Sequence, residues 1–415
     1  MSIARRFPAL ASRDFTIFLV GQFVSVIGTW MQNTAQPYLA YRISGRPLDL
    51  GLIGFASTLP TLLLALPAGV LVERWDKRKT VIIFQSIMAL QAFGLAALTF
   101  SGQIQIWHIG VLALIFGIAS AVEITARQAM LVELSGREAL PSAIALQSMV
   151  FNIGRVIGPL TASWLLTSTG TEGSVFVTNS VSYLFVIAGL FITQTRYKLP
   201  RESSVNKSLG TEFQEGLGYI RRNSLVASII LMAALVGFFG FPLVQQIPAL
   251  ARDVLKTAID TETDVAARTS LLYTAQGAGA LTAALLAAYM SSSENKGRMV
   301  ILGQIAFIFP LIALGYVPNL RISLLLLVFI GWGTVTQLVS MNTLIQVSVP
   351  NGLRGRVFSV YLWALQGVAP FGSLLIGWLA QNWGVPFAAL TGGLVSLISI
   401  GVLHIVSPGV RRAQA

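Results

Sequence analysis

The amino-acid sequence predicts an all-α integral membrane protein, with twelve transmembrane helices arranged as two six-helix bundles. The chain has 415 residues, of which 54% are hydrophobic and only 11% are charged, and its mean hydropathy is +0.74. Soluble proteins carry about a quarter charged residues. A helix needs about 20 mostly apolar residues to cross a hydrocarbon core of ~30 Å, and stretches of this length fill nearly all of the chain.

The predicted spans follow one another with short polar or glycine- and proline-containing breaks between them. They cover residues 15–41, 48–72, 80–101, 106–128, 140–168, 173–195, 224–251, 268–290, 299–317, 321–346, 356–382 and 385–407. We predict helices because lipid cannot hydrogen bond to backbone groups, and because the runs are too long for the strands of a membrane barrel. Asn382, Gly384 and Pro386 separate the last two spans.

The net charge of +12 is distributed asymmetrically along the chain. With the N-terminus inside, the cytoplasmic segments hold 20 of the 28 Lys and Arg residues and the outer loops hold six, while Arg127 and Arg155 lie within spans. Basic loops stay on the cytoplasmic side, so we expect both termini to be cytoplasmic. The basic residues then orient the protein and meet anionic membrane lipids, and no nucleic-acid partner is expected.

A polar stretch over residues 196–223 divides the spans six and six. We therefore expect an N-terminal bundle over residues 1–195, a cytoplasmic linker over 196–223 and a C-terminal bundle over 224–415. Apolar residues recur at helical spacing over 209–220, which predicts an amphipathic helix on the inner membrane face; a plain linker is the alternative. Matching residues in the two halves indicate parallel repeats, an arrangement that places a binding site between them.

The composition narrows the chemistry. The chain has no cysteine, and its two histidines, His108 and His404, are isolated in the sequence, so we expect no disulfide, metal site or cofactor. It has no Walker phosphate-binding motif and no long soluble segment, which argues against an enzyme and against a pump driven by ATP on its own. The first apolar run is long enough to span and lacks a small-residue cleavage site, so we expect it to be retained.

The loop between the second and third spans combines a glycine with clustered charges: Gly69, Glu73, Arg74, Asp76, Lys77 and Arg78. It resembles the loop signature of the major facilitator superfamily, with Glu73 in place of Asp and Asp76 in place of the second Gly. The resemblance implies a latch that closes the cytoplasmic side. Glu73 would sit at the N-terminus of the eleventh helix near Gly355, where the helix dipole favours an anion. Lys77 and Arg78 would pair with acids at the inner end of the fourth helix; an ordinary positive-inside loop is the alternative.

The fifth span carries Gly154, Gly158 and Pro159, which resemble the GxxxGP core of a motif associated with exporters and antiporters of that superfamily. Small residues four apart let helix backbones approach closely, and proline bends the helix. The segments 126–134 (ARQAMLVEL) and 144–148 (IALQS) resemble the branch that contains macrolide efflux proteins and the enterobactin exporter. The resemblance implies two bundles that rock around a central cavity.

Charged residues inside the membrane are costly and indicate function by default. Glu123 and Arg127 are four residues apart near the inner end of the fourth span, so they can pair on one face. We expect Glu123 to belong to the gate, with proton carriage as the alternative. Arg155 lies half-way along the fifth span with no acid at its depth, so its partner is either a neighbouring carbonyl, amide or water, or an anionic substrate group.

The first span carries polar residues at spacings of three and four, which form one stripe that should face an interior or a water-filled cavity. Together with polar residues on other spans, they are the predicted substrate-binding residues: Gln22, Ser25, Thr29, Asn33, Gln36, Asn152, Arg155, Gln245, Gln337 and Gln366. Hydrogen bonding between helices, without any contact to a ligand, is the alternative for each of them.

These features favour a secondary active transporter of a prokaryotic cytoplasmic membrane that works by alternating access. We expect a monomer that exports amphipathic small molecules, such as drugs, macrolides or siderophore-like compounds, with protons as the candidate coupling ion. Two alternatives stay open. One is a lipid or lysolipid translocator of the same fold without proton coupling, and the other is a membrane receptor or scaffold that transports nothing.

Overall fold

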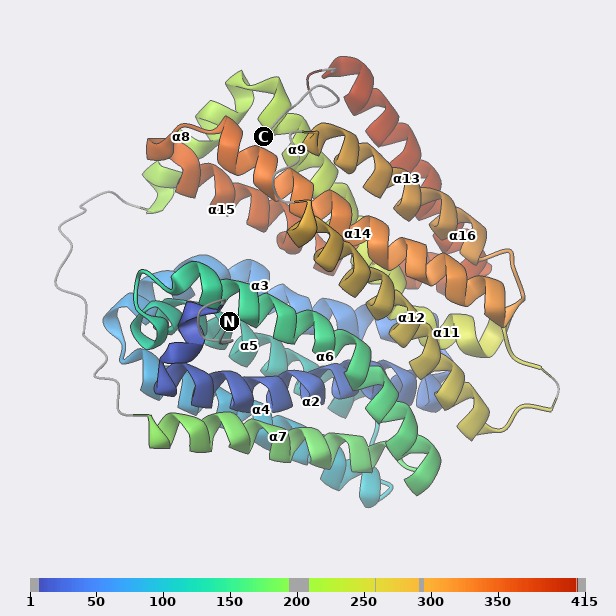
Figure 1. The fold of residues 1–415 in the computed structure, drawn as a ribbon. Helices are drawn as coiled ribbons and strands as arrows, with labels where there is room; N and C mark the ends of the chain where they lie inside the picture. Colours follow the sequence, from blue (N-terminus) through green and yellow to red (C-terminus); the bar gives the residue numbers. More distant parts are fainter. Residues whose placement is uncertain (1–6, 194–208, 258, 291–294, 408, 410–415) are drawn as a thin grey trace. The chain divides into compact units, whose positions relative to one another are not determined.

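The computed structural model describes residues 7–193, 209–257, 259–290, 295–407 and 409, and these residues form helices and short connections without a strand (Figure 1). The helices before the linker are η1 (Pro8–Ala11), α2 (Arg13–Ser44), α3 (Pro47–Arg74), α4 (Lys77–Phe100), α5 (Ile106–Ser135), α6 (Leu140–Thr169) and α7 (Glu172–Ile192). Those after it are α8 (Leu209–Arg222), α9 (Ser224–Leu235), η2 (Val236–Gly240), α10 (Phe241–Gln245), α11 (Ile247–Ala249), η3 (Leu250–Val254), α12 (Glu262–Tyr289), α13 (Lys296–Leu314), α14 (Leu320–Ser348), α15 (Asn351–Gly367) and α16 (Ala369–Val406).

The all-α membrane fold is confirmed. Eleven helical stretches in the described residues are long and apolar enough to cross a membrane. The last of them, Gly352–Val406, contains two of the predicted spans, so the count agrees with twelve. Gly384, with φ of 85°, breaks α16 between these two spans, where only glycine adopts the backbone conformation without strain.

The chain folds into two compact units. The first contains Met1–Ser44, Ala56–Ser203 and Asp260–Thr274, and the second contains Gly45–Phe55, Ser204–Ile259 and Ala275–Ala415. The units follow the two halves of the sequence except at two helices. The first turns of α3 belong to the second unit, and the first turns of α12 belong to the first unit.

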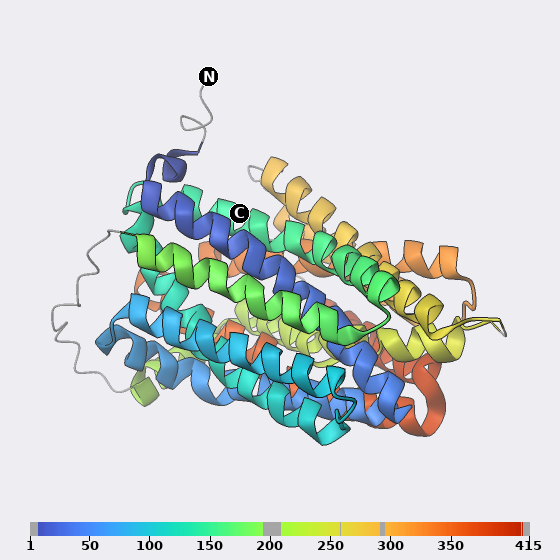
Figure 2. The same cartoon turned by 90° about the horizontal axis from the view of Figure 1, so that it is seen from below.

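Small residues set the packing of the first unit. Helix α2 packs against α6 and α7, and Figure 2 shows α2 (dark blue) and α7 (green) running side by side. At Gly28 on α2, a Cβ atom would collide with Ser182 and Asn179 of α7. At Gly158 on α6, a Cβ atom would lie 3.0 Å from the carbonyl oxygen of Ile27 on α2. These contacts fix α2 between its two neighbours.

The seventh span is not the continuous helix predicted over 224–251. It is divided into α9, the π-helical turn η2, α10, α11 and a second π-helical turn, η3. Pro242 and Pro248 lack the N–H group that a continuous helix needs, and the chain leaves helical geometry at Gln246. At Gly237, any Cβ would collide with the Leu365 carbonyl, so the irregular segment lies close against α15. The predicted span 356–382 is likewise divided, between α15 and α16.

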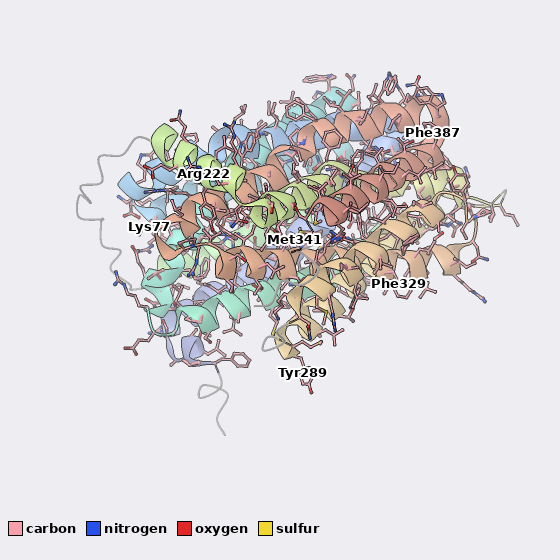
Figure 3. The ribbon with its side chains drawn as sticks, turned by 90° about the horizontal axis from the view of Figure 1, so that it is seen from above. Lys77, Arg222, Tyr289, Phe329, Met341 and Phe387 are labelled. Atoms are coloured by element: carbon pink, nitrogen blue, oxygen red, sulfur yellow. The ribbon has the colours of Figure 1, made fainter. Side chains whose placement is uncertain are left out.

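The linker helix is present as α8, while residues 194–208 lie outside the described part of the chain. It packs against α15, with Glu215 paired with Arg356 and the Tyr219 hydroxyl donating to the Ser348 carbonyl at 3.3 Å. Arg222 at the end of α8 and Phe387 on α16 lie at opposite ends of the second unit (Figure 3).

Phe387 belongs to an exposed aromatic cluster on α16. Its ring centroid lies 5.4 Å from that of Trp383, which lies 5.0 Å from that of Trp378. All three side chains are exposed. Aromatic residues are enriched at the interface between membrane and water, so this cluster is where a membrane interface is expected on the second unit.

Candidate functional site

A cationic side chain lies on an aromatic ring at the middle of the spans of the first unit. The Arg155 Cζ atom of α6 is 5.4 Å from the ring centroid of Trp30 on α2. Phe151, one turn before Arg155, packs edge to face against the same Trp30 ring at 5.4 Å. A guanidinium over a tryptophan ring is attracted by the ring quadrupole, so Trp30 holds the charge in place.

Arg155 has unused hydrogen-bonding capacity. Its Nε atom is buried, and none of its donors is bonded to any residue that the structure describes. No carboxylate of those residues lies within 4.0 Å of it. A buried charged donor without an acceptor is costly. The interaction with Trp30 is attractive, but it does not replace an acceptor.

Two amides lie within a turn of this pair. Asn33, one turn after Trp30 on α2, is exposed, and Asn152, one turn before Arg155 on α6, is half-buried and donates to the Ser148 carbonyl at 2.8 Å. Polar side chains half-way along a span avoid lipid and face protein or water. We refer to Trp30, Asn33, Asn152 and Arg155, together with Phe151, as the Arg155 face.

The predicted stripe on α2 does not face one cavity. Asn33 is exposed, whereas Thr29 and Gln36 hydrogen bond to side chains in the interior of the first unit. Thr29 lies 3.1 Å from the Tyr183 hydroxyl of α7. Gln22 and Ser25 are buried, and the Gln22 Oε1 atom has no hydrogen-bond partner among the described residues.

A buried amide network that the sequence reasoning missed joins α2, α4 and α7. Gln32 Nε2 donates to Gln36 at 3.0 Å and to Gln91 at 3.1 Å, and Gln32 Oε1 accepts from Asn179 at 2.7 Å. Asn179 also lies 3.4 Å from the Tyr183 hydroxyl. The four-residue spacing of Gln32 and Gln36 is a signal of this network in the sequence. It is easily overlooked, because Gln32 is next to Asn33 in the chain but points to another helix.

The three predicted residues of the second unit are separated. Gln245 accepts a hydrogen bond from Ser373 at 3.3 Å, Gln337 is fully buried, and Gln366 is exposed. Neither amide atom of Gln337 has a partner within the described part of the chain, and its backbone packs against Gly303. Among the residues that the structure describes, no two of these three side chains are hydrogen bonded to each other.

The charged residues near the end of the first unit that is predicted to be cytoplasmic form two pairs. Glu123 Oε1 accepts from Arg127 at 3.1 Å and from Gln85 at 2.9 Å. Lys77 Nζ lies 2.5 Å from Glu133 Oε1, and both side chains are largely buried. Glu133 lies on α5, which is the fourth predicted span, so the expected pairing of Lys77 with an acid of that span is present. Glu123 is hydrogen bonded to Arg127 and Gln85 and not to Lys77.

Asp76 has a structural role in the loop signature. Its side chain accepts a hydrogen bond from the Lys79 backbone N–H at 2.9 Å and caps the N-terminus of α4. An aspartate at this position satisfies one of the unpaired backbone donors of the first turn. The side chains of Glu73 and Arg74 lie outside the described residues.

Gly69 of that signature and Gly355, just before the eleventh predicted span, make no close contact. A Cβ atom added at Gly69 or at Gly355 would meet no atom within 4 Å, so these glycines are not required by packing in this structure. Arg78 is half-buried at the start of α4. The proposed contact of Glu73 with the eleventh helix remains a prediction.

At the outer end predicted from the charge distribution, the first unit contains a second set of polar contacts. Arg42 of α2 makes two parallel hydrogen bonds to Glu172 of α7, at 2.7 and 3.0 Å. The Tyr38 hydroxyl donates to the main-chain carbonyl of Glu262 on α12 at 2.9 Å. Tyr38 therefore attaches the first turn of α12 to α2.

In the second unit, the first turns of α3 pack closely against α16. A Cβ atom at Gly51 would collide with the Ser373 carbonyl and lie 3.1 Å from the Gly377 Cα atom. Gln246, at the break in the seventh span, donates to the Pro47 carbonyl at 3.3 Å. The sequence did not indicate these contacts, because they depend on which helices meet.

Comparisons with known proteins give a consistent result. Residues 4–413 match the family described as Transmembrane secretion effector. The chain is 23% identical over 402 residues to the multidrug efflux pump Tap of Mycolicibacterium fortuitum, covering 95% of this chain and 96% of Tap. It is 23% identical over 414 residues to the enterobactin exporter EntS of Escherichia coli O1:K1 / APEC, covering 97% of this chain and 92% of EntS.

Solved structures of the same fold are similar at low identity. The nucleoside transporter NupG superposes with a TM-score of 0.71 and 13% identity, covering 95% of this chain and 98% of that chain. This similarity concerns the fold alone. Within the described residues, no group of three or more His, Cys, Asp or Glu side chains could hold a metal ion.

Proposed function

Because the chain belongs to the Transmembrane secretion effector family of major facilitator transporters, we propose that this efflux transporter exports amphipathic small molecules by alternating access across a bacterial cytoplasmic membrane. Arg155 on Trp30 is the observation that supports this most directly. An unpaired charge half-way along a transmembrane helix is retained for a function, and a bound substrate would supply the missing acceptor.

The contacts at the two ends of the units support a gating role. Tyr38 with Glu262 and the close approach of Gly51 to Gly377 are candidates for the outer gate. The candidate inner gate contains Lys77 with Glu133, and Arg127 with Glu123. Alternating access requires that the contacts closing one end are lost in the state that is open at that end. Glu123 and Arg127 lie on the same helix and would keep their pair.

Proton antiport is the coupling that we propose, with Glu123 in the gate rather than on the proton path. Its carboxylate accepts hydrogen bonds from Arg127 and from Gln85, and breaking up a buried charged pair of this kind is costly. The bond to Gln85 connects α5 to α4, and the bond to Arg127 lies within α5. This arrangement suits a group that stabilises one conformation.

The test is transport by the purified protein in liposomes, with a panel of amphipathic compounds and with or without an imposed pH gradient. We expect saturable, protein-dependent movement of at least one compound class, accelerated by the gradient. Thermal unfolding of the reconstituted protein controls for folding. Folded protein that moves no compound of the panel would contradict the export function, and transport indifferent to the gradient would contradict only proton coupling.

A lipid translocator is the second candidate, and one observation favours it. A hollow of about 240 Å³ between α2, α6 and α7 is lined by almost entirely apolar atoms, including those of Phe23, Ile27, Met31 and Phe185. Such a surface suits an acyl chain. A fluorescent lysolipid and a fluorescent phospholipid in the same liposomes separate the two functions, since only a translocator would move them faster than protein-free membranes do.

A further inference from the structure

The position of Arg155, half-way along α6, suits the binding of an anion. It is the sixteenth residue of the 30-residue helix α6, and Trp30 lies at a similar position along α2. Arginine keeps its charge at any physiological pH and presents five donors in a rigid planar fork. Since no described residue accepts from this fork, its terminal N–H groups are the donors that a ligand could use.

The aromatic surface beside this charge is rigid. A Cβ atom at Gly158 would collide with the Cβ atom of Trp30, and one at Gly154 would lie 3.4 Å from the Trp30 ring. The backbone of α6 therefore packs directly against Trp30 and restricts the position of its side chain. Phe151 closes one edge of the ring in a T-shaped contact. Rings prefer offset or edge-to-face partners, so a flat ligand ring finds two surfaces with defined geometry.

The guanidinium of Arg155 lies beside the rings of Trp30 and Phe151, so a matching ligand carries an anionic group next to an aromatic ring. We propose that the Arg155 face binds an organic anion in which a carboxylate is attached directly to an aromatic ring. The acidic oxygens would accept two parallel hydrogen bonds from Arg155, and the attached ring would pack beside Trp30 and Phe151. Asn33 and Asn152, each one turn away, would serve further polar substituents.

The same arrangement disfavours organic cations. A positive ligand would meet Arg155, and no carboxylate among the described residues lies within 4.0 Å of the guanidinium to offset the repulsion. Like charges at close range in a poorly solvated site repel strongly. The Arg155 face therefore selects against lipophilic amines. This inference rests on the proposed export function, and it assigns a substrate class to the same site.

Four probes separate charge from aromaticity. They are 2-naphthoate, its methyl ester, cyclohexanecarboxylate and 2-(aminomethyl)naphthalene. Isothermal titration calorimetry of the purified protein measures their dissociation constants. We expect the tightest binding for 2-naphthoate, weaker binding for the ester and for cyclohexanecarboxylate, and the weakest for the amine. Equal affinity for all four probes would overturn the assignment.

Substitutions of Arg155 and Trp30 test whether these residues contribute to the binding free energy. Arg155→Lys keeps the charge and loses the fork, and Arg155→Gln loses both. Since hydrogen bonds to charged groups contribute more than neutral ones, we expect Arg155→Gln to weaken 2-naphthoate binding roughly 10- to 100-fold while changing ester binding much less. Arg155→Lys should fall between wild type and Arg155→Gln. Trp30→Leu should weaken binding of the naphthyl compounds more than that of cyclohexanecarboxylate.

Two matched controls distinguish the site from general effects. Arg137→Gln removes an exposed positive charge from the loop before α6, and Trp164→Leu removes an exposed tryptophan from α6 itself. Both should bind 2-naphthoate as wild type does. Equal loss for every probe in folded Arg155→Lys would make Arg155 structural and overturn the proposal. Transport of other compounds with no preference for ring-linked acids would overturn this inference while leaving the export function intact.

Discussion

Glu123 illustrates how a single residue links helices in the first unit. Its Oε1 atom accepts from Arg127 on its own helix and from Gln85 on α4, and the side chain is almost fully buried. Removing one partner of a buried charged pair is strongly destabilising, because it leaves the other charge without compensation. The role of Glu123 is therefore best tested by neutralising it without changing its shape.

We predict that Glu123→Gln lowers gradient-driven transport and substrate exchange together. The amide cannot balance the charge of Arg127, so the gate would lose stability in one state. The measurement is counterflow exchange and pH-driven transport in the same liposomes, with Glu138→Gln on the exposed loop as the control. Normal exchange with abolished gradient-driven transport would instead assign the proton to Glu123.

The charged residues inside the spans could be located from the sequence, whereas the hydrogen-bond partners of the buried amides could not. Glu123, Arg127 and Arg155 stand out because each interrupts an apolar run, and the spacing of the first two is enough to pair them. The hydrogen bond of Gln32 with Asn179 joins two helices across 147 residues of the chain. The hydropathy pattern does not indicate which face of α2 packs against which neighbouring helix.

At the scale of elements, hydropathy located the spans because every lipid-exposed helix must be apolar along its length. It did not locate the divisions of the seventh span, since π-helical turns keep the same apolar composition. Such turns appear frequently at functional sites. Here the first turn brings Gly237 against the Leu365 carbonyl, and the break at Gln246 lies between the two turns.

Gly384 offers a test of an element boundary. Its φ of 85° and ψ of 160° belong to a region that only glycine adopts readily, and strain of this kind costs about 1–3 kcal/mol. Gly384→Ala should therefore lower the thermal unfolding midpoint. Gly401→Ala is the matched control on the same helix, because a Cβ there meets nothing within 4 Å. Equal midpoints for the two variants would show that the turn relaxes without strain.

At the scale of the whole molecule, α3 and α12 each contribute to both compact units. The outer contacts described above involve the first turns of these two helices. Tyr38 bonds to Glu262 at the start of α12, and Gly51 packs against Gly377 near the start of α3. We expect a conformational change that opens this end to break both contacts, since each holds the first turns of α12 or α3 against another helix.

We predict that Gly51→Val favours the conformation in which this contact is broken. The added side chain would collide with the Ser373 carbonyl, which a packed helix cannot accommodate. In this cysteine-free chain, Ser373→Cys can be labelled with a maleimide, and we expect faster labelling in the Gly51→Val background. Gly110→Val, which meets no atom within 4 Å, is the control. Unchanged labelling would show that the contact adapts locally.

The charge asymmetry of the loops predicts the topology of the entire chain. A cysteine at Gln103 should react with a membrane-impermeant maleimide in intact cells, because the loop after α4 is expected outside. A cysteine at Glu138 should react only after the membrane is opened. Both positions are exposed in the structure. The opposite labelling pattern would invert the orientation and place both termini outside.

The unused donors of Arg155 have an evolutionary consequence. Asn152 is one helical turn before Arg155, and asparagine codons differ from aspartate codons by a single base. An aspartate there would pair with Arg155 at i, i+3 and neutralise the Arg155 face from within. One mutation would thus remove the selection against cations, so a population under pressure from a cationic toxin could convert an anion exporter into a broader one without changing its fold.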